Sequence, residues 1–149
     1  MAKYGMELNR TASTSFAVGG WFVNATRPRR AKIYDLMFGS EASPADNAFL
    51  WQIQRSTTAG VSTGVTPQPL DPADAATEAT AGENHTTDGT LTSLAIILSI
   101  PLNQRASYRW VAAPGGELIL PATASNGFHL RTPTATAVAV TATVHIDEM

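Results

Sequence analysis

The chain has 149 residues, a formal net charge of −2, a charged fraction of only 15% and no cysteine. This length fits a single domain spanning 1–149 with a hydrophobic core, and the lack of cysteine excludes disulfides, thiolate zinc sites and a cysteine nucleophile. The weak negative charge predicts no attraction to nucleic acid or anionic lipid. No apolar signal core is present in Met1–Arg10, and the longest apolar run is too short to cross a bilayer.

Four candidate strands lie in the first part of the chain. Lys3–Asn9 has a weak signal, Ser15–Asn24 is apolar but interrupted by Gly19 and Gly20, and Arg30–Phe38 and Ala48–Arg55 alternate between two faces. In the last of these, Phe49, Trp51 and Ile53 share one face, whereas Gln52 and Gln54 share the other. This pattern predicts a strand with one face in a hydrophobic core.

A long segment without Lys or Arg, Ser56–Gln104, interrupts this pattern. Its first part, 56–92, is polar and broken by prolines, and it carries the acids Asp71, Asp74, Glu78, Glu83 and Asp88. Connections of this length are usually functional or disordered, so we expect a flexible acidic connection that is a candidate interface segment. The N-cap Asp and first-turn Pro of Asp71–Ala76 predict one or two helical turns within it.

The remainder of the chain again has the character of strands. The continuous apolar run Leu94–Ile100, ended by Pro101, fits a central strand or a strand buried at an interface. Further candidates are Ala106–Val111, Glu117–Leu120, Phe128–Arg131 and Thr136–Ile146. The last places Val138, Val140, Ala142, Val144 and Ile146 on one face and Thr141, Thr143 and His145 on the other. About eight strands separated by turn signals predict an all-β, single-domain β-sandwich of the jelly-roll type.

No catalytic, cofactor-binding or metal-binding pattern is present in the sequence. The histidines His85, His129 and His145 lack metal-ligand spacing and are interpreted as surface or edge residues, although His129 and His145 would meet if their strands paired. The acids of the connection lack the EF-hand spacing. Asp35 lies within a strand among apolar neighbours, which predicts an ion pair with a cation rather than catalysis.

Positive charge is densest in a cluster formed by Arg27, Arg29, Arg30 and Lys32. Such a cluster could bind phosphates, but the acidic balance of the chain argues against nucleic-acid binding. We therefore expect the cluster to pair with acids of its own chain or of a neighbouring subunit. The tryptophans Trp21, Trp51 and Trp110 are interpreted as core residues, with sugar-binding platforms as the alternative.

Three blocks of the sequence resemble small virion structural proteins of tailed bacteriophages, in particular cyanophages. The blocks are Thr26–Arg55, Thr66–Thr77 and Pro101–Glu148, and they cover most of the chain. The resemblance implies a non-enzymatic capsid decoration or cement protein, which binds the outer surface of the head at seams between capsomers of the major capsid protein. It brings no catalytic residues with it.

The resemblance also implies partners and a location. The partners are the major capsid protein and further copies of the chain, with a trimer favoured, and the location is the capsid exterior of a virion assembled in the host cytoplasm. Neither nucleic acid nor membrane is expected as a partner. The interface candidates are Arg27, Arg29, Arg30, Lys32, Asp71, Asp74, Glu78, Glu83 and Asp88. The alternatives are a tail or baseplate accessory, a carbohydrate-binding virion protein and, from another class, a small hydrolase or metal-dependent enzyme.

Overall fold

The computed structural model describes residues 1–134 and 137–149, and this part of the chain is built from strands and turns without a helix. The strands are β1 (Ala2–Thr11), β2 (Gly19–Phe22), β3 (Ala31–Ser40), β4 (Ala48–Ser56), β5 (Gly60–Val65), β6 (Gln68–Pro69), β7 (Thr80–Asp88), β8 (Leu91–Asn103), β9 (Tyr108–Val111), β10 (Leu118–Leu120), β11 (Gly127–Arg131) and β12 (Ala139–Glu148). Every segment predicted to be a strand contains one, which confirms the all-β class. The predicted last strand began at Thr136, which lies outside the described residues. No helix among the described residues is long and apolar enough to span a membrane.

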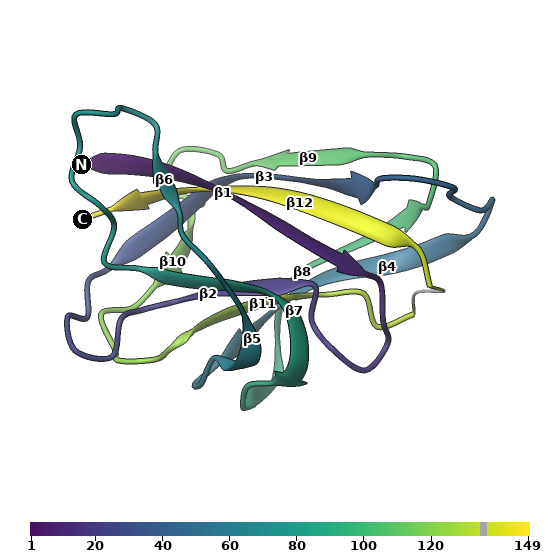
Figure 1. Cartoon of the computed structure of the whole chain (residues 1–149), viewed down its shortest axis with the longest axis horizontal. Helices are drawn as coiled ribbons and strands as arrows, with labels where there is room; N and C mark the ends of the chain where they lie inside the picture. Colours follow the sequence, from purple (N-terminus) through teal and green to yellow (C-terminus); the bar gives the residue numbers. More distant parts are fainter. Residues whose placement is uncertain (135–136) are drawn as a thin grey trace.

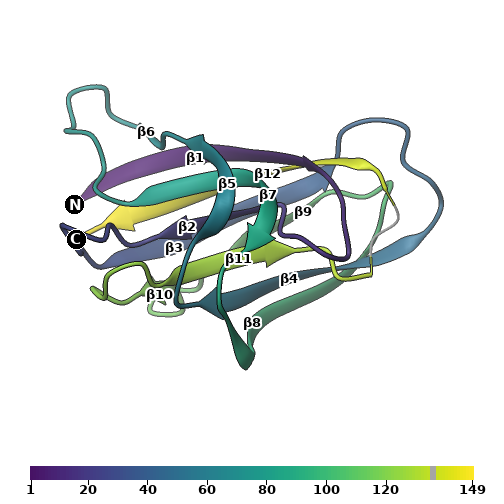
Figure 2. The ribbon, with the colours of Figure 1, turned by 60° about the horizontal axis from the view of Figure 1, so that its bottom comes forward.

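The strands form two antiparallel sheets of six, which lie as two layers in Figure 1. The first sheet has the order β10-β3-β12-β1-β6, with β9 also paired to β3, and the second has the order β5-β7-β2-β11-β4-β8. The two ends of the chain lie side by side, because β1 pairs with β12 from Ala2 opposite Glu148 onward (Figure 1). Figure 2 shows the same layers turned, with β5 and β7 at the near side.

A single hydrophobic core lies between the sheets. Strand periodicity of two directs alternate side chains inward, so Val140, Ala142 and Val144 of β12 are fully buried. Trp51 of β4 packs on Phe38 of β3 with ring centroids 4.6 Å apart, which joins the two sheets across the core. Trp21 and Trp51 are 0% and 1% exposed, so the interpretation of these two residues as core is confirmed.

The segment 56–92 is more regular than expected, because it contains β5, β6, β7 and the start of β8. β5 and β7 pair with each other, β7 joins β2 of the second sheet, and β6 joins β1 of the first. The expectation of a flexible, irregular connection is therefore wrong for most of this segment. β5, β6 and β8 lie at sheet edges, whereas β7 pairs on both sides, with β5 and β2. None of the segment between Gly60 and Asp88 alternates between an apolar and a polar face, so the hydrophobic pattern gave no signal there.

The helical turns predicted at Asp71–Ala76 are also absent. The Asp74 N–H donates to the Asp71 carbonyl at 3.0 Å, and the Ala73 N–H donates to Asp71 Oδ1 at 2.9 Å. The Asp71 side chain thus closes a turn on its own backbone instead of capping a helix, which is the usual competition at such residues.

β8 departs from its prediction in position. It forms the edge of the second sheet rather than its centre, and it continues through Pro101 to Asn103. Proline is tolerated there because an edge strand has one side without ladder hydrogen bonds. The pairing of β8 with β4 shifts register between Gln54 and Ser56, whose partners are Ile96 and Leu91. Residues 92–95 consequently form a bulge.

Candidate functional site

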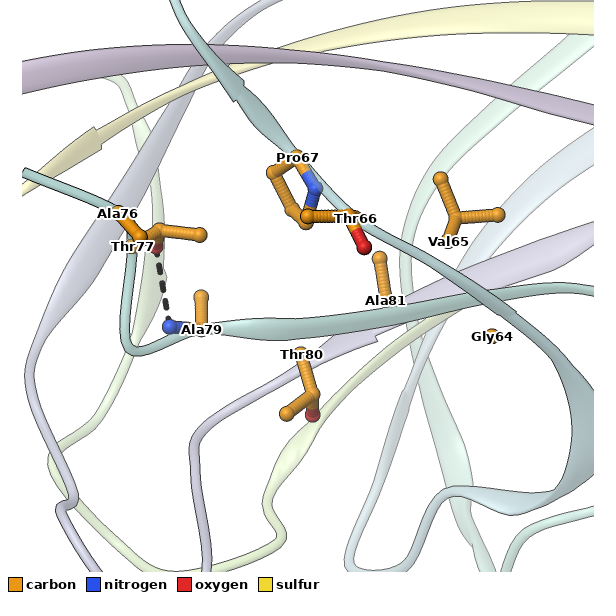
Figure 3. A pocket seen from close by; sticks show the side chains of 9 residues that line it. All are labelled: Gly64, Val65, Thr66, Pro67, Ala76, Thr77, Ala79, Thr80 and Ala81. Atoms are coloured by element: carbon orange, nitrogen blue, oxygen red, sulfur yellow. Dashed lines mark hydrogen bonds between the residues drawn. The ribbon is translucent and has the colours of Figure 1, made fainter.

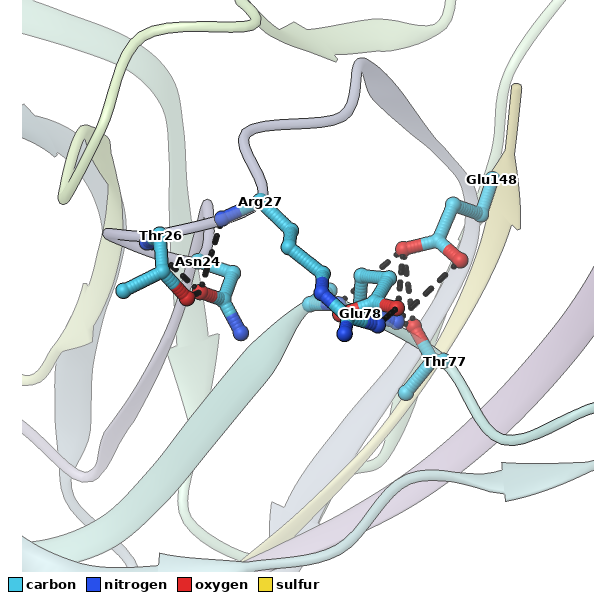
Figure 4. A network of polar contacts seen from close by, with 7 residues as sticks. Asn24, Thr26, Arg27, Thr77, Glu78 and Glu148 are labelled. Carbon is cyan, nitrogen blue, oxygen red and sulfur yellow. Dashed lines mark hydrogen bonds and ion pairs between the residues drawn. The ribbon is translucent and has the colours of Figure 1, made fainter.

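The basic cluster and the acidic connection meet at the end of the molecule that holds both termini. Asn24 Oδ1 accepts hydrogen bonds from the N–H groups of Thr26 (2.8 Å) and Arg27 (3.2 Å), which fixes the loop that carries Arg27. The Arg27 guanidinium then pairs with Glu78 Oε1 at 3.0 Å (Figure 4). The pair is largely exposed on its arginine side, so its contribution to stability is small.

Glu148 of β12 fastens the same stretch of the connection to the first sheet. Its carboxylate accepts hydrogen bonds at 3.0 Å from the Thr77 hydroxyl, the Glu78 N–H and the Ala79 N–H (Figure 4). Glu148 is 7% exposed. Backbone donors that converge on a buried carboxylate form strong hydrogen bonds, so this residue holds the connection in place.

The other cations of the cluster are free to contact another chain. Arg29 and Arg30 are exposed and Lys32 is half-buried, and no carboxylate among the described residues lies within ion-pair distance of them. Arg29 lines a hollow of about 450 Å³ together with Asp74, Glu78 and Glu148. One predicted pairing thus occurs within the chain, and pairing with a neighbouring subunit stays a prediction for Arg29 and Arg30.

The remaining acids of the connection differ in their surroundings. Glu83 accepts a hydrogen bond from the Asn9 N–H at 2.7 Å, and so ties β7 to β1. Asp88 accepts a hydrogen bond from the Ala17 N–H at 2.7 Å and pairs with Arg131 at 3.2 Å. Asp71 and Asp74 lie in the turn described above, where Asp71 is exposed. Asp71 is therefore the most accessible acid for an external partner.

The ion pair predicted for Asp35 is present. Arg109 of β9 donates to both carboxylate oxygens, from Nε at 3.0 Å and from Nη2 at 2.8 Å, and His145 Nδ1 lies 3.2 Å from Oδ2. The hydrogen bonds from Arg109 hold the pKa of Asp35 below its ordinary value, against the opposing effect of burial. The arrangement fixes β9 and β12 to β3, and it requires no catalytic interpretation.

A shallow pocket lies within the connection, between the end of β5 and the start of β7 (Figure 3). Its volume is about 450 Å³, and its lining consists of Gly64, Val65, Thr66, Pro67, Ala76, Thr77, Ala79, Thr80 and Ala81. None of these side chains ionises in the neutral range. The pocket can therefore supply shape and hydroxyl groups, but no acid or base of its own.

The apolar edge, defined as Leu94 and Ile96 of β8, is the most unusual surface of the molecule. Leu94 is 93% exposed and Ile96 is 42% exposed. Leu94 also has a φ of 58°, a left-handed conformation that is uncommon for a residue other than glycine. The sequence predicted either a central strand or a strand buried at an interface for this run. The central position is wrong, because hydrophobic periodicity does not distinguish a buried strand from an edge strand, and burial at an interface stays a prediction.

The histidines are arranged differently from expectation. His129 lies on β11 of the second sheet and His145 on β12 of the first, so their strands do not pair. His129 instead contacts His85 of the connection, with ring centroids 4.8 Å apart, and both are fully buried. The interpretation of these two as surface or edge residues is wrong, because the end of the β5–β7 hairpin covers them.

No family model, curated protein or solved structure matches this chain. Its function must therefore be argued from the residues and surfaces described above.

Proposed function

We propose that the protein is a non-enzymatic capsid decoration, or cement, protein of a tailed bacteriophage. In this proposal it binds the outer surface of the head at seams between capsomers of the major capsid protein and stabilises the shell. The apolar edge carries the proposal, since Leu94 is 93% exposed at the edge of a sheet that has an otherwise well-filled core. Adhesion needs a stiff body with accessible apolar and hydrogen-bonding groups, and β8 offers both.

The exposure of Leu94 has no benefit within the isolated chain. A left-handed backbone at a residue other than glycine costs on the order of 1 kcal/mol or more, and the side chain gains nothing from burial in return. Burial against a partner would return roughly 1.5–3 kcal/mol for each fully covered Leu or Ile side chain. Many copies on one particle turn such modest contacts into a large collective stabilisation.

We further infer that the sandwich is a jelly roll with an insertion. One layer would consist of β1, β12 and β3, with β9 and β10, which both pair with β3, together taking the place of a fourth strand. The other layer would consist of β2, β11, β4 and β8. The strands β5, β6 and β7 would then be an insertion between the fourth and fifth strands. A two-layered antiparallel body of this kind transmits load without unfolding, which suits a protein that bridges seams.

The partners in this proposal are the major capsid protein and further copies of the chain, with a trimer favoured. The support comes from complementary charge at one end of the molecule, where the exposed Arg29 lines the same hollow as Asp74 of the turn that Asp71 begins. The runner-up, a tail or baseplate accessory that binds carbohydrate, has weaker support. Trp21 and Trp51 are buried and cannot serve as stacking platforms for sugars.

The test is binding of purified protein to heads that lack it, measured as occupancy by cryo-electron microscopy and by sedimentation. The substitution Leu94→Lys should weaken binding at least tenfold, which corresponds to about 1.4 kcal/mol, and should leave the fold intact because the side chain is exposed. The matched control is Val111→Lys, since Val111 is 57% exposed on β9 of the other sheet. Equal occupancy for all three proteins, or copies found only at the tail, would refute the proposal.

A further inference from the structure

A second, smaller cluster of buried rings lies on the outer face of the second sheet. Phe128 and Leu130 of β11 point into the main core, so His129 between them points to the opposite face. Phe22 of β2 lies on that outer face as well, with its ring centroid 5.1 Å from that of His129. The end of the β5–β7 hairpin covers this face and contributes His85, and both histidines are 0% exposed.

Three ligand-type side chains converge in this cluster. One ligand atom from each of His85, Asp88 and His129 can be chosen so that the atoms all lie within 4.8 Å of one another. Nδ1 of His129 is buried without a hydrogen-bond partner, and neither ring nitrogen of His85 makes a hydrogen bond of ordinary geometry, although the backbones of Gly82 and Thr87 lie beside that ring. Buried polar groups without partners are rare in folded proteins and cost on the order of 1–3 kcal/mol each. Three such nitrogens in one place call for a ligand.

We propose that His85, Asp88 and His129 bind a divalent transition-metal cation of the zinc type. Two imidazole nitrogens and one carboxylate oxygen form a common ligand set for such ions, with a water molecule or a partner group in the remaining position. The proposal is independent of the function proposed above.

Two backbone groups contact His129 Nε2. The Gly89 N–H donates to it at 3.3 Å, and the Ala59 carbonyl oxygen lies 3.3 Å away, where it would accept from an N–H at that position. A proton on Nε2 satisfies Ala59 and leaves the lone pair on Nδ1, the atom without a partner, whereas the Gly89 hydrogen bond needs the lone pair on Nε2. Binding of a metal ion at Nδ1 selects the first arrangement, in which a backbone carbonyl supports the second nitrogen, as is usual for a metal-binding histidine.

Charged groups around the site change its affinity for a metal ion. Arg131 pairs with Asp88 Oδ2 at 3.2 Å, and Arg10 contacts the His85 carbonyl oxygen. Both guanidinium groups oppose a dication and reduce its affinity. Arg131 also orients the carboxylate, which has about four lone-pair positions and can serve a metal and an arginine together.

The geometry predicts that the site closes when it binds a metal ion. In a tetrahedral site, two ligands at about 2.1 Å from the ion are about 3.4 Å apart, whereas the ligand atoms here lie within 4.8 Å of one another, so they must approach by up to about 1.4 Å. Binding would therefore connect the end of β7 to the central strand β11. The consequence is that the β5–β7 ribbon at this edge of the second sheet becomes stiffer.

The test is titration of chelator-treated protein with Zn²⁺ by calorimetry, followed by Co²⁺ titration read from its visible absorption. We expect one equivalent of either ion to bind, and a rise in Tm of roughly 5–10 °C at a free Zn²⁺ concentration 100-fold above Kd. The variant His85→Phe should abolish both signals. It should nevertheless fold, because a phenyl ring fits a cluster that already contains Phe22.

The matched control is His145→Gln, which removes a histidine that belongs to the Asp35 ion pair on the other sheet. This variant should bind both ions like the unmodified protein. Absence of Zn²⁺ and Co²⁺ binding by the unmodified protein would overturn the proposal, and so would equal binding by His85→Phe. In either case the two histidines would be packing partners of Phe22 and nothing more.

Discussion

Removal of the Glu148 carboxylate is the sharpest test of how the connection is held. The substitution Glu148→Ala leaves three donors without their acceptor, namely the Thr77 hydroxyl and the N–H groups of Glu78 and Ala79, each now at 3.0 Å from it. A hydrogen bond to a charged group contributes about 1.5–3 kcal/mol. All three donor residues are only half-buried, so water replaces part of this loss. We therefore expect the free energy of unfolding to fall by about 2–4 kcal/mol.

Urea denaturation and thermal unfolding measure this change directly. A loss of about 2–4 kcal/mol corresponds to a decrease in Tm of roughly 5–15 °C for a chain of this size. Hydrogen exchange adds a local measurement, because the amides of Glu78 and Ala79 should lose protection before the rest of the chain. Glu148→Gln keeps one oxygen acceptor without the charge and should cost about half as much.

The control is Glu41→Ala, since Glu41 is exposed and its side chain makes no hydrogen bond or ion pair with the described residues. If Glu148→Ala unfolds at the same urea concentration as Glu41→Ala, the carboxylate does not hold the connection. The reasoning about convergent donors would then be refuted.

Two further predictions concern the first sheet and the core. The pKa of Asp35 is lowered, mainly by Arg109, so its contribution to stability is present above the unfolded pKa near 3.8 and is lost as pH falls through the folded value. Urea denaturation from neutral pH to about pH 3 should therefore show the stability gap between the unmodified protein and Asp35→Asn closing as pH falls; a constant gap would contradict the assignment. Gly127→Ala should destabilise strongly, because its Cβ would clash with the Trp21 carbonyl oxygen, a backbone atom that cannot move aside, whereas Gly64→Ala meets nothing within 4 Å and should be neutral in thermal unfolding. Equal Tm values for the two glycine variants would show that β2 and β11 can separate.

The sequence predicted those strands whose side chains separate into a buried and an open face. β12 and β4 are examples, because alternate residues such as Val144 and Trp51 meet the core while their neighbours do not. β7 could not be found in this way. Its sequence TAGENHTTD is polar throughout, and it forms a strand because β2 and β5 supply ladder partners on both sides. Pairing of that kind depends on segments far apart in the chain, which local pattern cannot reveal.

Charge segregation predicted contact between the basic cluster and the acidic connection, but it could not identify the pairs. Arg27 and Glu78 meet because the loop held by Asn24 and the segment held by Glu148 end at the same place. The histidine cluster had no signal at all in the sequence. His85 and His129 are 44 positions apart, and the intervening strands β8 to β10 belong to different parts of the fold.

The connection between β4 and β8 explains why one molecule carries several unusual surfaces. A short turn between β4 and β8, which pair with each other, would leave the outer face of the second sheet open to water. Here β5 and β7 continue the ribbon and bend back over that face, since the Asn84 N–H donates to the Val18 carbonyl oxygen and Asn84 itself has a φ of 49°. The bend buries His85 over His129, and the same ribbon enters β8 through the bulge that exposes Leu94. A metal ion at His85 would therefore stiffen the strand that leads to the apolar edge, so the proposed ligand and the proposed adhesion would act on one element of the fold.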